Sequence, residues 1–422
     1  MSHQPWKICA VAALTLAAFV PAASAASSGD DYANQTPYGN PKDTDVRKKP
    51  SGYTMFFLET VGRHGLRSLT TEQNSTEGDA LSLWNSANKK HALTDNGQTL
   101  SRDIKRFQEA ERKIGYGKLS ARGRDEMKGI GRRTEDNYAS FFASVKRKNE
   151  KVATYTSDVT RTKQSAAALQ DGLGSSLDKI LGKPVAADKL LHWGNNASSA
   201  GQAMIDKIRS RSSIRDHAKH VLKASYKSSY VDSIKDPVSA ALDLYLLYST
   251  APGLAKETDI TFARYVPQED REAMSYATDA RTFYKYGPGV KGETKTFSQA
   301  RPLLADFFDR LDRRIDGSST AAVFRVAHGE TTMPFAALIK APGSQEQTPK
   351  GEAFDRDTNP WRGAVAGKPS GNIEWTAFRN KDKKVLVTMR YNEKPVPFHS
   401  GCTPYKKGSY YYRVSELKSC LG

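Results

Sequence analysis

The chain has 422 residues, of which 38% are hydrophobic and 26% charged, so it can bury a sizeable core and is neither a collagen, a coiled coil nor a multispan membrane protein. Its 64 Lys and Arg outnumber 46 Asp and Glu, which gives a formal net charge of +18. This surplus attracts anions, and the partner it indicates is nucleic acid, an anionic surface or a polyphosphorylated small molecule.

The N-terminus predicts an export signal. Lys7 precedes the apolar run 8–20, and small residues follow up to Ala25, which fits cleavage after Ala25. The run is shorter than the ~20 residues of a membrane span, although an uncleaved anchor is the alternative. We therefore expect a secreted or periplasmic protein in which residues 26–50 form an N-terminal arm.

The elements predicted along the chain indicate an α/β fold, because strands alternate with helices. Residues 68–115 are polar and loop-rich, with helical patches, and a helix N-cap is expected at Ser120. Residues 174–299 have apolar residues at helical spacing and are interpreted as an inserted, mainly α-helical smaller domain. Strands are expected at 53–61, 152–156, 321–327, 372–378 and 385–391, and helices at 124–149, 160–173 and 300–315.

These elements predict a three-layer sandwich with a mostly parallel central sheet, formed by residues 51–173 and 300–422. The last two strands are expected to be an antiparallel pair.

The first strand runs directly into the sequence Arg-His-Gly-Leu-Arg, residues 63–67. Guanidinium groups bind phosphate oxygens in a planar, bidentate manner, so Arg63 and Arg67 are candidate phosphate ligands. His64 lies between them, where it could attack phosphorus, and Gly65 lets a ligand approach the backbone. The alternative is a basic surface loop with one solvated histidine.

Two other predicted strands end in residues of the same chemistry. Arg161 follows the strand at 152–156 and is a candidate third phosphate ligand. His328 and Glu330 follow the strand at 321–327, where the histidine could donate to phosphate and the acid could protonate a leaving alkoxide. Each residue alone could be structural, but the ends of parallel strands converge on one crevice, so we expect them to meet His64.

On these motifs the chain resembles the histidine phosphatases, in the branch that holds histidine acid phosphatases and phytases. The similar segments are the signature at 63–67, the region 117–132, the segment 157–166 and the sequence Ala-His-Gly-Glu at 327–330. The resemblance covers roughly residues 34 to 422.

One subgroup of this branch fits best. Most members have His-Asp at the distal site, whereas the acid here is Glu330, a spacing similar to that of the multiple inositol polyphosphate phosphatases. Thr36-Pro37-Tyr38 and Asn392-Glu393 also resemble this subgroup. The chain departs from the pattern at Ser68-Leu69, where a proline is usual, and at Gly329, where alanine is usual. These departures concern the substrate range more than the reaction type.

The resemblance implies a two-step phosphomonoesterase that needs no metal or other cofactor. His64 would form a phosphohistidine, and Glu330 would protonate the leaving oxygen and then activate water. The groups that would hold the phosphoryl oxygens are Arg63, Arg67, Arg161 and His328. The implied substrate is an inositol polyphosphate, and the candidate contacts to its distal phosphates are Lys89, Lys90 and Lys163, which lie near the motifs in sequence.

Two other functions are considered: a broad-specificity acid phosphatase and a catalytically inactive binder of polyanions. The net charge would concentrate an anionic substrate at a basic cleft, or it reflects a generally cationic surface. No nucleic-acid partner is expected, nor a membrane partner after signal cleavage, and the oligomeric state is open. Cys402 and Cys420 are the two cysteines left after export, and such a pair predicts a disulfide rather than a zinc site.

Overall fold

The computed structural model describes residues 32–422 apart from 40, 42–43, 45, 47, 73–75 and 195–196. The predicted signal peptide and its cleavage position at Ala25 lie outside the described residues. No helix in the described part of the chain has the length and apolar character needed to cross a membrane.

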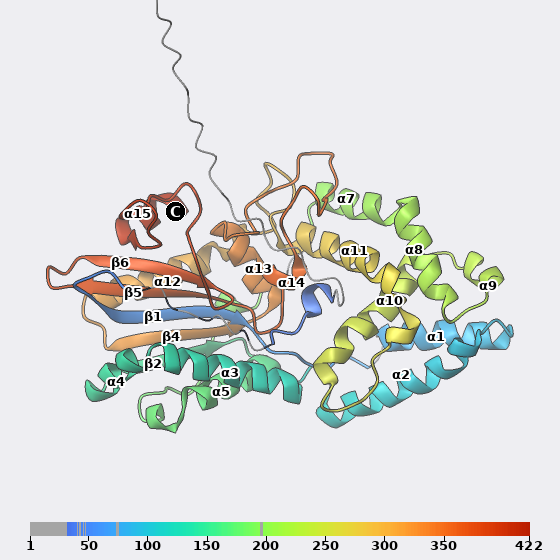
Figure 1. The fold of residues 1–422 in the computed structure, drawn as a ribbon, viewed down its shortest axis with the longest axis horizontal. Coiled ribbons are helices and arrows are strands. Elements are labelled where there is room, and N and C mark those ends of the chain that lie inside the picture. The colour runs from blue at the N-terminus through green and yellow to red at the C-terminus, as the bar shows by residue number, and fades with distance from the viewer. Residues whose placement is uncertain are drawn as a thin grey trace, which may run out of the picture.

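The centre of the molecule is an eight-stranded sheet in the order β3-β2-β4-β1-β5-β6-β7, with β8 paired to β6 (Figure 1). Pairing is parallel from β3 through β2 and β4 to β1, and antiparallel from β1 onward. The predicted α/β fold is confirmed, including the antiparallel pair β5 and β6. The strands are β1 (Tyr53–Arg63), β2 (Lys151–Thr156), β3 (Val185–Ala186), β4 (Thr320–Ala327), β5 (Asn372–Asn380), β6 (Val385–Tyr391), β7 (Lys394–Val396) and β8 (Tyr412–Arg413).

The register places three strand ends at one edge of the sheet. Arg63 of β1 lies opposite Ala327 of β4, and Thr156 of β2 lies opposite Val326. The loops that follow these strands therefore leave the sheet side by side, as the sequence predicts.

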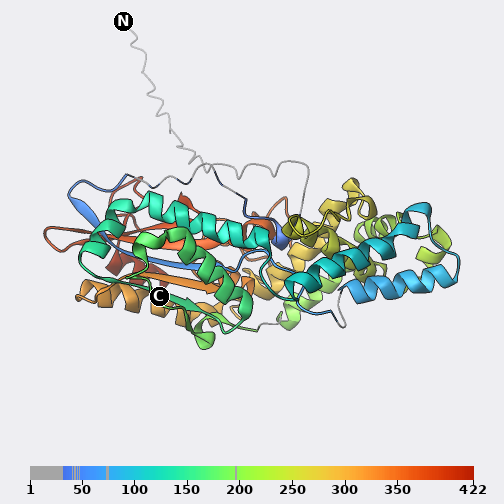
Figure 2. The same ribbon diagram turned by 90° about the horizontal axis from the view of Figure 1, so that it is seen from below.

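Successive side chains of a strand point to opposite faces of the sheet, and helices pack on both faces, which gives three layers. Phe57 and Val61 of β1 pack with one set of helices, whereas Leu58 between them packs with the other. Figures 1 and 2 show these helices on opposite faces of the sheet. One layer contains α3 (Ala121–Asn137), α4 (Ala139–Arg147) and α5 (Thr160–Leu173); the other contains α12 (Arg301–Ile315), α13 (Gly329–Leu338) and α15 (Val414–Leu421).

The helix expected over 124–149 is divided into α3 and α4 at Tyr138, whose φ of −124° is not helical. The Tyr138 side chain is buried, and its hydroxyl donates to Glu374 on β5. This contact with the sheet fixes the position of the break. The N-cap at Ser120 is confirmed, because its hydroxyl accepts a bond of 3.1 Å from the Gly123 N–H.

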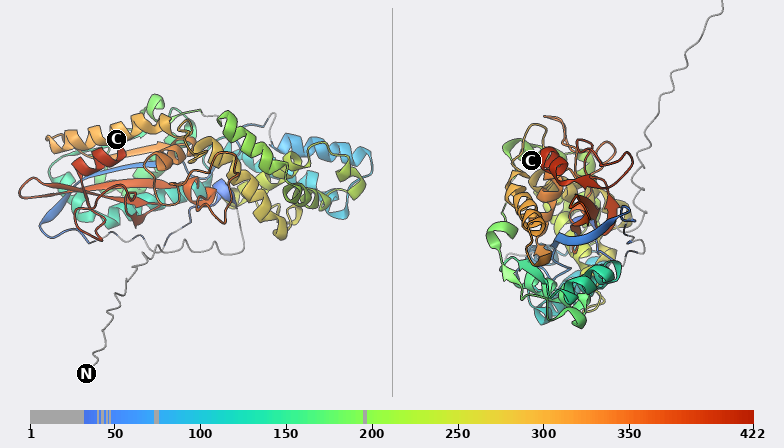
Figure 3. Two further views of the ribbon diagram at one scale, coloured as in Figure 1. Left: turned by 90° about the horizontal axis from the view of Figure 1, so that it is seen from above. Right: turned by 90° about the vertical axis from the view of Figure 1, so that its left-hand side faces the viewer.

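A second group of helices extends beyond the sheet edge and encloses its own apolar cluster (Figure 3). It includes two helices within residues 68–115; this segment was expected to be loop-rich with helical patches, and the loop-rich part of that expectation was wrong, because the two helices occupy most of it. Each helix has a charged face and a narrow apolar stripe, so the segment is polar on average. On α2 the stripe is formed by Leu100, Ile104 and Phe107. The helices are α1 (Thr76–Lys89), α2 (Asp95–Ile114), α7 (Ser199–Arg209), α8 (Ser212–Lys223), α9 (Ser228–Asp232), α10 (Pro237–Thr250) and α11 (Gln268–Tyr286). The division of the chain into separate domains stays a prediction.

Short helices complete the connections. The α-helical turns are α6 (Asp188–Leu191) and α14 (Gly363–Ala366), and the 3-10 turns are η1 (Ala33–Gln35), η2 (Ser175–Leu177), η3 (Ala251–Leu254), η4 (Ala263–Tyr265) and η5 (Ser298–Ala300). Within the predicted N-terminal arm, Ala33 and Tyr38 are buried, so this part of the arm belongs to the packed structure.

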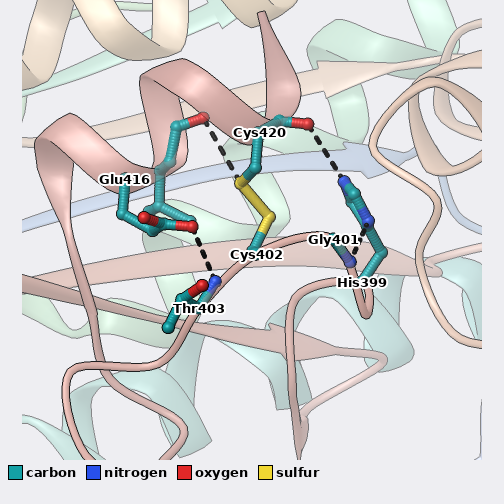
Figure 4. The surroundings of a disulfide bond; sticks show 7 residues. His399, Gly401, Cys402, Thr403, Glu416 and Cys420 are labelled. Atoms are coloured by element: carbon teal, nitrogen blue, oxygen red, sulfur yellow. Dashed lines mark hydrogen bonds between the residues drawn. A yellow bond between two sulfur atoms is a disulfide. The ribbon is translucent and has the colours of Figure 1, made fainter.

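The predicted disulfide between Cys402 and Cys420 is present, with 5.3 Å between the two Cα atoms. It ties α15 to the loop after β7 (Figure 4). His399 lies beside it, with Nε2 3.1 Å from the Cys420 carbonyl oxygen and Nδ1 accepting from the Gly401 N–H. On the other side, Glu416 accepts a bond from the Thr403 N–H.

Candidate active site

His64 lies at the end of β1 and is almost fully buried. Its backbone N–H donates to the Ala327 carbonyl of β4, so the sheet pairing itself holds it. The imidazole Nδ1 lies 2.8 Å from the Gly65 carbonyl oxygen. A carbonyl can only accept, so Nδ1 carries the proton and Nε2 keeps its lone pair.

The protein also keeps this imidazole neutral. Burial, followed by the charges of Arg63, Arg161 and Arg67, holds the pKa of His64 well below its usual 6.5. A neutral imidazole with a free Nε2 is the form that can act as a nucleophile.

Gly65 lets the His64 loop approach α3. A Cβ at this position would lie 2.5 Å from the Gly123 carbonyl oxygen and 2.9 Å from its carbon. Gly123 is equally restricted, because a Cβ there would meet the backbone of Leu66. The two glycines therefore set how closely the loop packs on the first turn of the helix.

Three arginines, Arg63, Arg67 and Arg161, lie close enough to His64 for their charges to act on it. The buried Arg63 donates from NH1 to two carbonyls, those of Asn34 at 2.6 Å and Gly367. Arg67 donates to the Ser68 carbonyl at 2.6 Å. The Nε atoms of Arg63, Arg67 and Arg161 are buried and have no hydrogen-bond partner among the described residues.

The electrostatics of this cluster favour an anion. Burial, and then the neighbouring guanidiniums, lowers the pKa of Arg63 to about 10 and that of Arg67 to about 9. The pKa of Arg161 is also lowered by its burial. A phosphoryl group would supply both the charge and the acceptors that these guanidiniums lack.

His328 closes the other side of the site. Its ring centroid lies 5.5 Å from that of His64, with the rings at 72° to each other. Arg161 NH2 lies 3.2 Å from Nδ1, and a guanidinium only donates, so Nδ1 accepts. The proton is then on Nε2, which donates over 2.8 Å to the Ser157 hydroxyl. Burial, and then Arg161, lowers the pKa of His328 to about 3, so this imidazole is neutral.

Glu330 lies half-buried in the first turn of α13, two residues beyond His328. Its charge raises the pKa values of Arg63, Arg67 and Arg161 against the dominant effect of burial, so it faces the same cluster. Within the described part of the chain, its carboxyl group has no hydrogen-bond partner. The group is therefore available for proton transfer.

The three predicted lysines do not join this cluster. Lys163 is half-exposed and forms an ion pair with Asp158. Lys89 ends α1, and Lys90 lies 5.5 Å from the centre of the Tyr230 ring beside α9, at the far end of the helical group (Figure 1). The expectation for Lys89 and Lys90 was wrong, because α1 leads the chain away from the site.

His192 is a site residue that sequence reasoning missed. Its ring lies 4.6 Å from that of His328, at 35°. The Thr331 hydroxyl donates to the Leu191 carbonyl at 2.8 Å, which ties this segment to α13. His192 follows the short helix α6 and belongs to none of the strand-end motifs, so no pattern in the sequence marks it.

The residues that resemble one subgroup form a buried support behind the site. Arg133 on α3 donates two bonds, of 2.9 and 2.7 Å, to the carboxylate of Glu393. Burial, followed by the charge of Glu393, raises the pKa of Tyr38, whose hydroxyl accepts from the Asn372 side chain. The arm, α3 and the sheet are joined through these contacts.

Two groups of side chains among the described residues have possible metal-ligand atoms close together. The first is His220 with Glu269 and Asp270; the second is His399 with Cys402 and Cys420, but those two sulfurs are joined in the disulfide and offer no thiolate ligand. Neither group contains a residue of the His64 cluster.

Comparison with known proteins agrees with this geometry. The sequence profile of the histidine phosphatase superfamily (branch 2) matches residues 54–392. Multiple inositol polyphosphate phosphatase 1 of Gallus gallus is 24% identical over 305 residues, which cover 67% of this chain and 65% of that protein, just under two thirds of its length.

Solved structures share the fold. The multiple inositol polyphosphate phosphatase of Bifidobacterium longum, in complex with inositol hexasulfate, has a TM-score of 0.89 at 25% identity, covering 93% of this chain and 98% of that one. The phytase of D. castellii has a TM-score of 0.69 at 12% identity, covering 92% and 84%, and this likeness shows the fold alone. The matched profile, together with the arginine-flanked histidine at the strand edge, shows that the chain belongs to branch 2 of the histidine phosphatase superfamily.

Proposed function

We propose that the protein is an exported phosphomonoesterase that removes phosphate from inositol polyphosphates through a phosphohistidine on His64. The observation that carries this proposal is the neutral, buried imidazole of His64, with Nε2 free, inside a ring of three guanidiniums that have unpartnered Nε atoms. Two relatives are named for multiple inositol polyphosphates, and one of them is described with inositol hexasulfate bound.

The first step transfers the phosphoryl group. His64 Nε2 attacks phosphorus while the bond to the ester oxygen breaks, and the protonated carboxyl group of Glu330 gives its proton to the leaving alkoxide. Arg63, Arg67 and Arg161 hold the phosphoryl oxygens, and their charge stabilises the transition state. His328 is held by Ser157 and Arg161 against the same group.

The second step reverses the roles. The Glu330 carboxylate accepts a proton from water as that water attacks the phosphohistidine. The N–P bond breaks, inorganic phosphate is released, and His64 returns to its neutral form. Glu330 and His64 are then in their starting states.

Export is supported by the disulfide, because such bonds persist in oxidising compartments. An inactive polyanion binder is disfavoured, because it predicts the loss of at least one member of the proposed set, and His64, the three arginines and Glu330 are all present. A broad-specificity acid phosphatase shares the same chemistry and differs in substrate range.

The test is phosphate release from inositol hexakisphosphate by the purified protein with a chelator present. We expect turnover, an acid-labile phosphoenzyme after rapid quench, and the loss of both in His64→Ala with an unchanged fold. A His64→Ala protein that still forms the phosphoenzyme would refute the assignment of the nucleophile. Much faster turnover of p-nitrophenyl phosphate than of the inositol ester would favour the broad-specificity alternative.

A further inference from the structure

The positive charge of this protein is concentrated at the end of the sheet opposite the active site. Four of the segments that meet there are rich in lysine: the approach to β1, the connection from α4 to β2, the turn from β5 to β6, and the loop before β8. Figure 3 (right) looks onto this end. Its exposed cations, called here the basic end, are Lys48, Lys49, Lys146, Arg147, Lys148, Lys151, Lys381, Lys383, Lys384, Lys406 and Lys407.

These eleven cations are poorly balanced. The same four segments contain two acids, Glu150 and Asp382, and Glu150 is already paired with Arg314. The surplus of nine is half of the formal net charge of +18. Among the described residues, none of the eleven forms an ion pair with a carboxylate.

A hollow lies inside the basic end. It has a volume of about 880 Å³, and Lys49, Arg147 and Lys148 contribute cations to its lining, with Phe56 and Asn380 beside them. A second hollow next to it is lined by Lys48 and by the loop 408–411. Four of the eleven cations therefore line concave surface that a chain-like anion could enter.

These charges are too far from the active site to act on its substrate. β1 runs from Tyr53 at the basic end to Arg63 at the site, and its ten steps span about 33 Å. The Debye length at physiological ionic strength is ~8 Å, so the field of the basic end is screened before it reaches His64. Attraction of a small substrate therefore does not explain this half of the charge.

The composition of the basic end indicates its partner. All but one of the cations are lysines. A lysine ammonium group is a flexible point charge, whereas the planar guanidinium group of arginine binds a phosphate group through two parallel hydrogen bonds. The exposed large hydrophobic residues in the described part of the chain are Val185 and Val365, and neither belongs to these segments. These cations would also be attracted to an anionic membrane, but stable anchoring there takes a second, apolar signal, which this end does not offer.

We propose that the basic end binds an acidic polysaccharide and holds the protein on it while the active site faces away. This inference is independent of the proposed function. The probes are immobilised heparin and immobilised polygalacturonate, with uncharged dextran as the control matrix, and the protein is the full exported chain.

The variant Lys381→Gln/Lys383→Asn/Lys384→Gln removes three cations from one turn. Asn is chosen at position 383 because φ is 61° there. The matched control is Lys223→Gln/Lys227→Gln/Lys235→Gln, which removes the same charge from exposed positions of the helical group. Circular dichroism checks that both variants are folded.

We expect the unaltered protein to bind both acidic matrices and to be released by salt. The basic-end variant should bind roughly tenfold more weakly, as for the loss of three exposed charge contacts, while the control variant binds normally. Both should hydrolyse the phosphate ester with unchanged kcat/KM. Equal weakening by the control variant, or binding to anionic phospholipid vesicles or duplex DNA but not to the polysaccharides, would overturn the proposal. A fall in kcat/KM confined to the basic-end variant would also overturn it, because the charge would then act on the substrate.

Discussion

Gly65→Ala tests whether the fold fixes the position of the nucleophile. The added Cβ would lie 2.5 Å from the Gly123 carbonyl oxygen, and an ordinary contact begins at 3.4 Å. Relief therefore needs a shift of about 0.9 Å. The opposing atoms are backbone at the start of α3, so we expect the loop with His64 to move rather than the helix.

Such a shift should affect turnover far more than stability. Overpacking of this kind costs about 1–3 kcal/mol, which a domain of this size tolerates. A misplacement of about 1 Å at a reacting centre lowers the rate by roughly 10²-fold. We therefore expect kcat for p-nitrophenyl phosphate to fall about a hundredfold, with the melting temperature reduced by a few degrees.

The matched control is Gly62→Ala, three residues earlier on β1. Its Cβ would have its nearest contacts at 3.4 Å, to Asn372 and Gly371, which is ordinary packing. This variant should keep most of the activity. If Gly65→Ala turned over at the normal rate, the site would not depend on this close approach and the reasoning would be refuted.

Three further predictions concern the acid, the disulfide and the distal histidine. Glu330→Gln should lose far more activity on inositol hexakisphosphate than on p-nitrophenyl phosphate, because the phenolate leaves without a proton. The phosphoenzyme should accumulate with the aryl ester. Equal losses on both substrates, without accumulation in quench-flow experiments, would make Glu330 structural. Replacing Cys402 and Cys420 by Ser opens a loop of 18-residue separation and should lower the free energy of unfolding by roughly 3 kcal/mol in urea titrations, whereas an unchanged midpoint would contradict the contribution of chain entropy. The pKa of His328 is about 3 in the folded state against 6.5 in the unfolded chain, so the unfolded chain takes up the proton first as the pH falls. The free energy of unfolding should therefore fall as the pH drops from 6.5 towards 3, by on the order of 2 kcal/mol at pH 5. His328→Asn should reduce this loss in urea titrations at pH 7 and pH 5, and an identical pH dependence would contradict the prediction.

The sheet and its site edge could be predicted because their signals are local. Each of the residues His64, Arg161 and His328 follows a run of apolar, β-prone residues within one to five positions. Parallel pairing then brings the ends of those strands together without any further information. Ser120 is likewise a local signal, for a helix start, whereas Gly65 was expected to let a ligand approach the backbone and instead packs against Gly123 of α3.

The rest of the site depends on contacts that no local pattern records. Arg63 is held by Asn34 and Gly367, which lie 29 and 304 residues away in sequence. His192 lies against His328 in a segment that the Thr331 hydroxyl ties to α13 through the Leu191 carbonyl.

For Lys89, closeness in sequence wrongly suggested closeness in space. Lys89 is near the motif in sequence, yet α1 has 14 residues and carries the chain about 21 Å along the helical group.

The hydrogen bond from the Arg63 guanidinium to the Asn34 carbonyl matters for how this protein is produced in the laboratory. Residues 54–392 are the part that matches the family, and they make a natural choice when a shorter version is designed. That version would contain every residue of the proposed reaction, yet it would omit Asn34 and Tyr38 at one end and both cysteines at the other. Arg63 would lose one of its two fixed carbonyl acceptors, and its guanidinium could rotate away from the phosphoryl position. Weak activity of such a fragment would therefore reflect the trimmed ends rather than the wrong substrate.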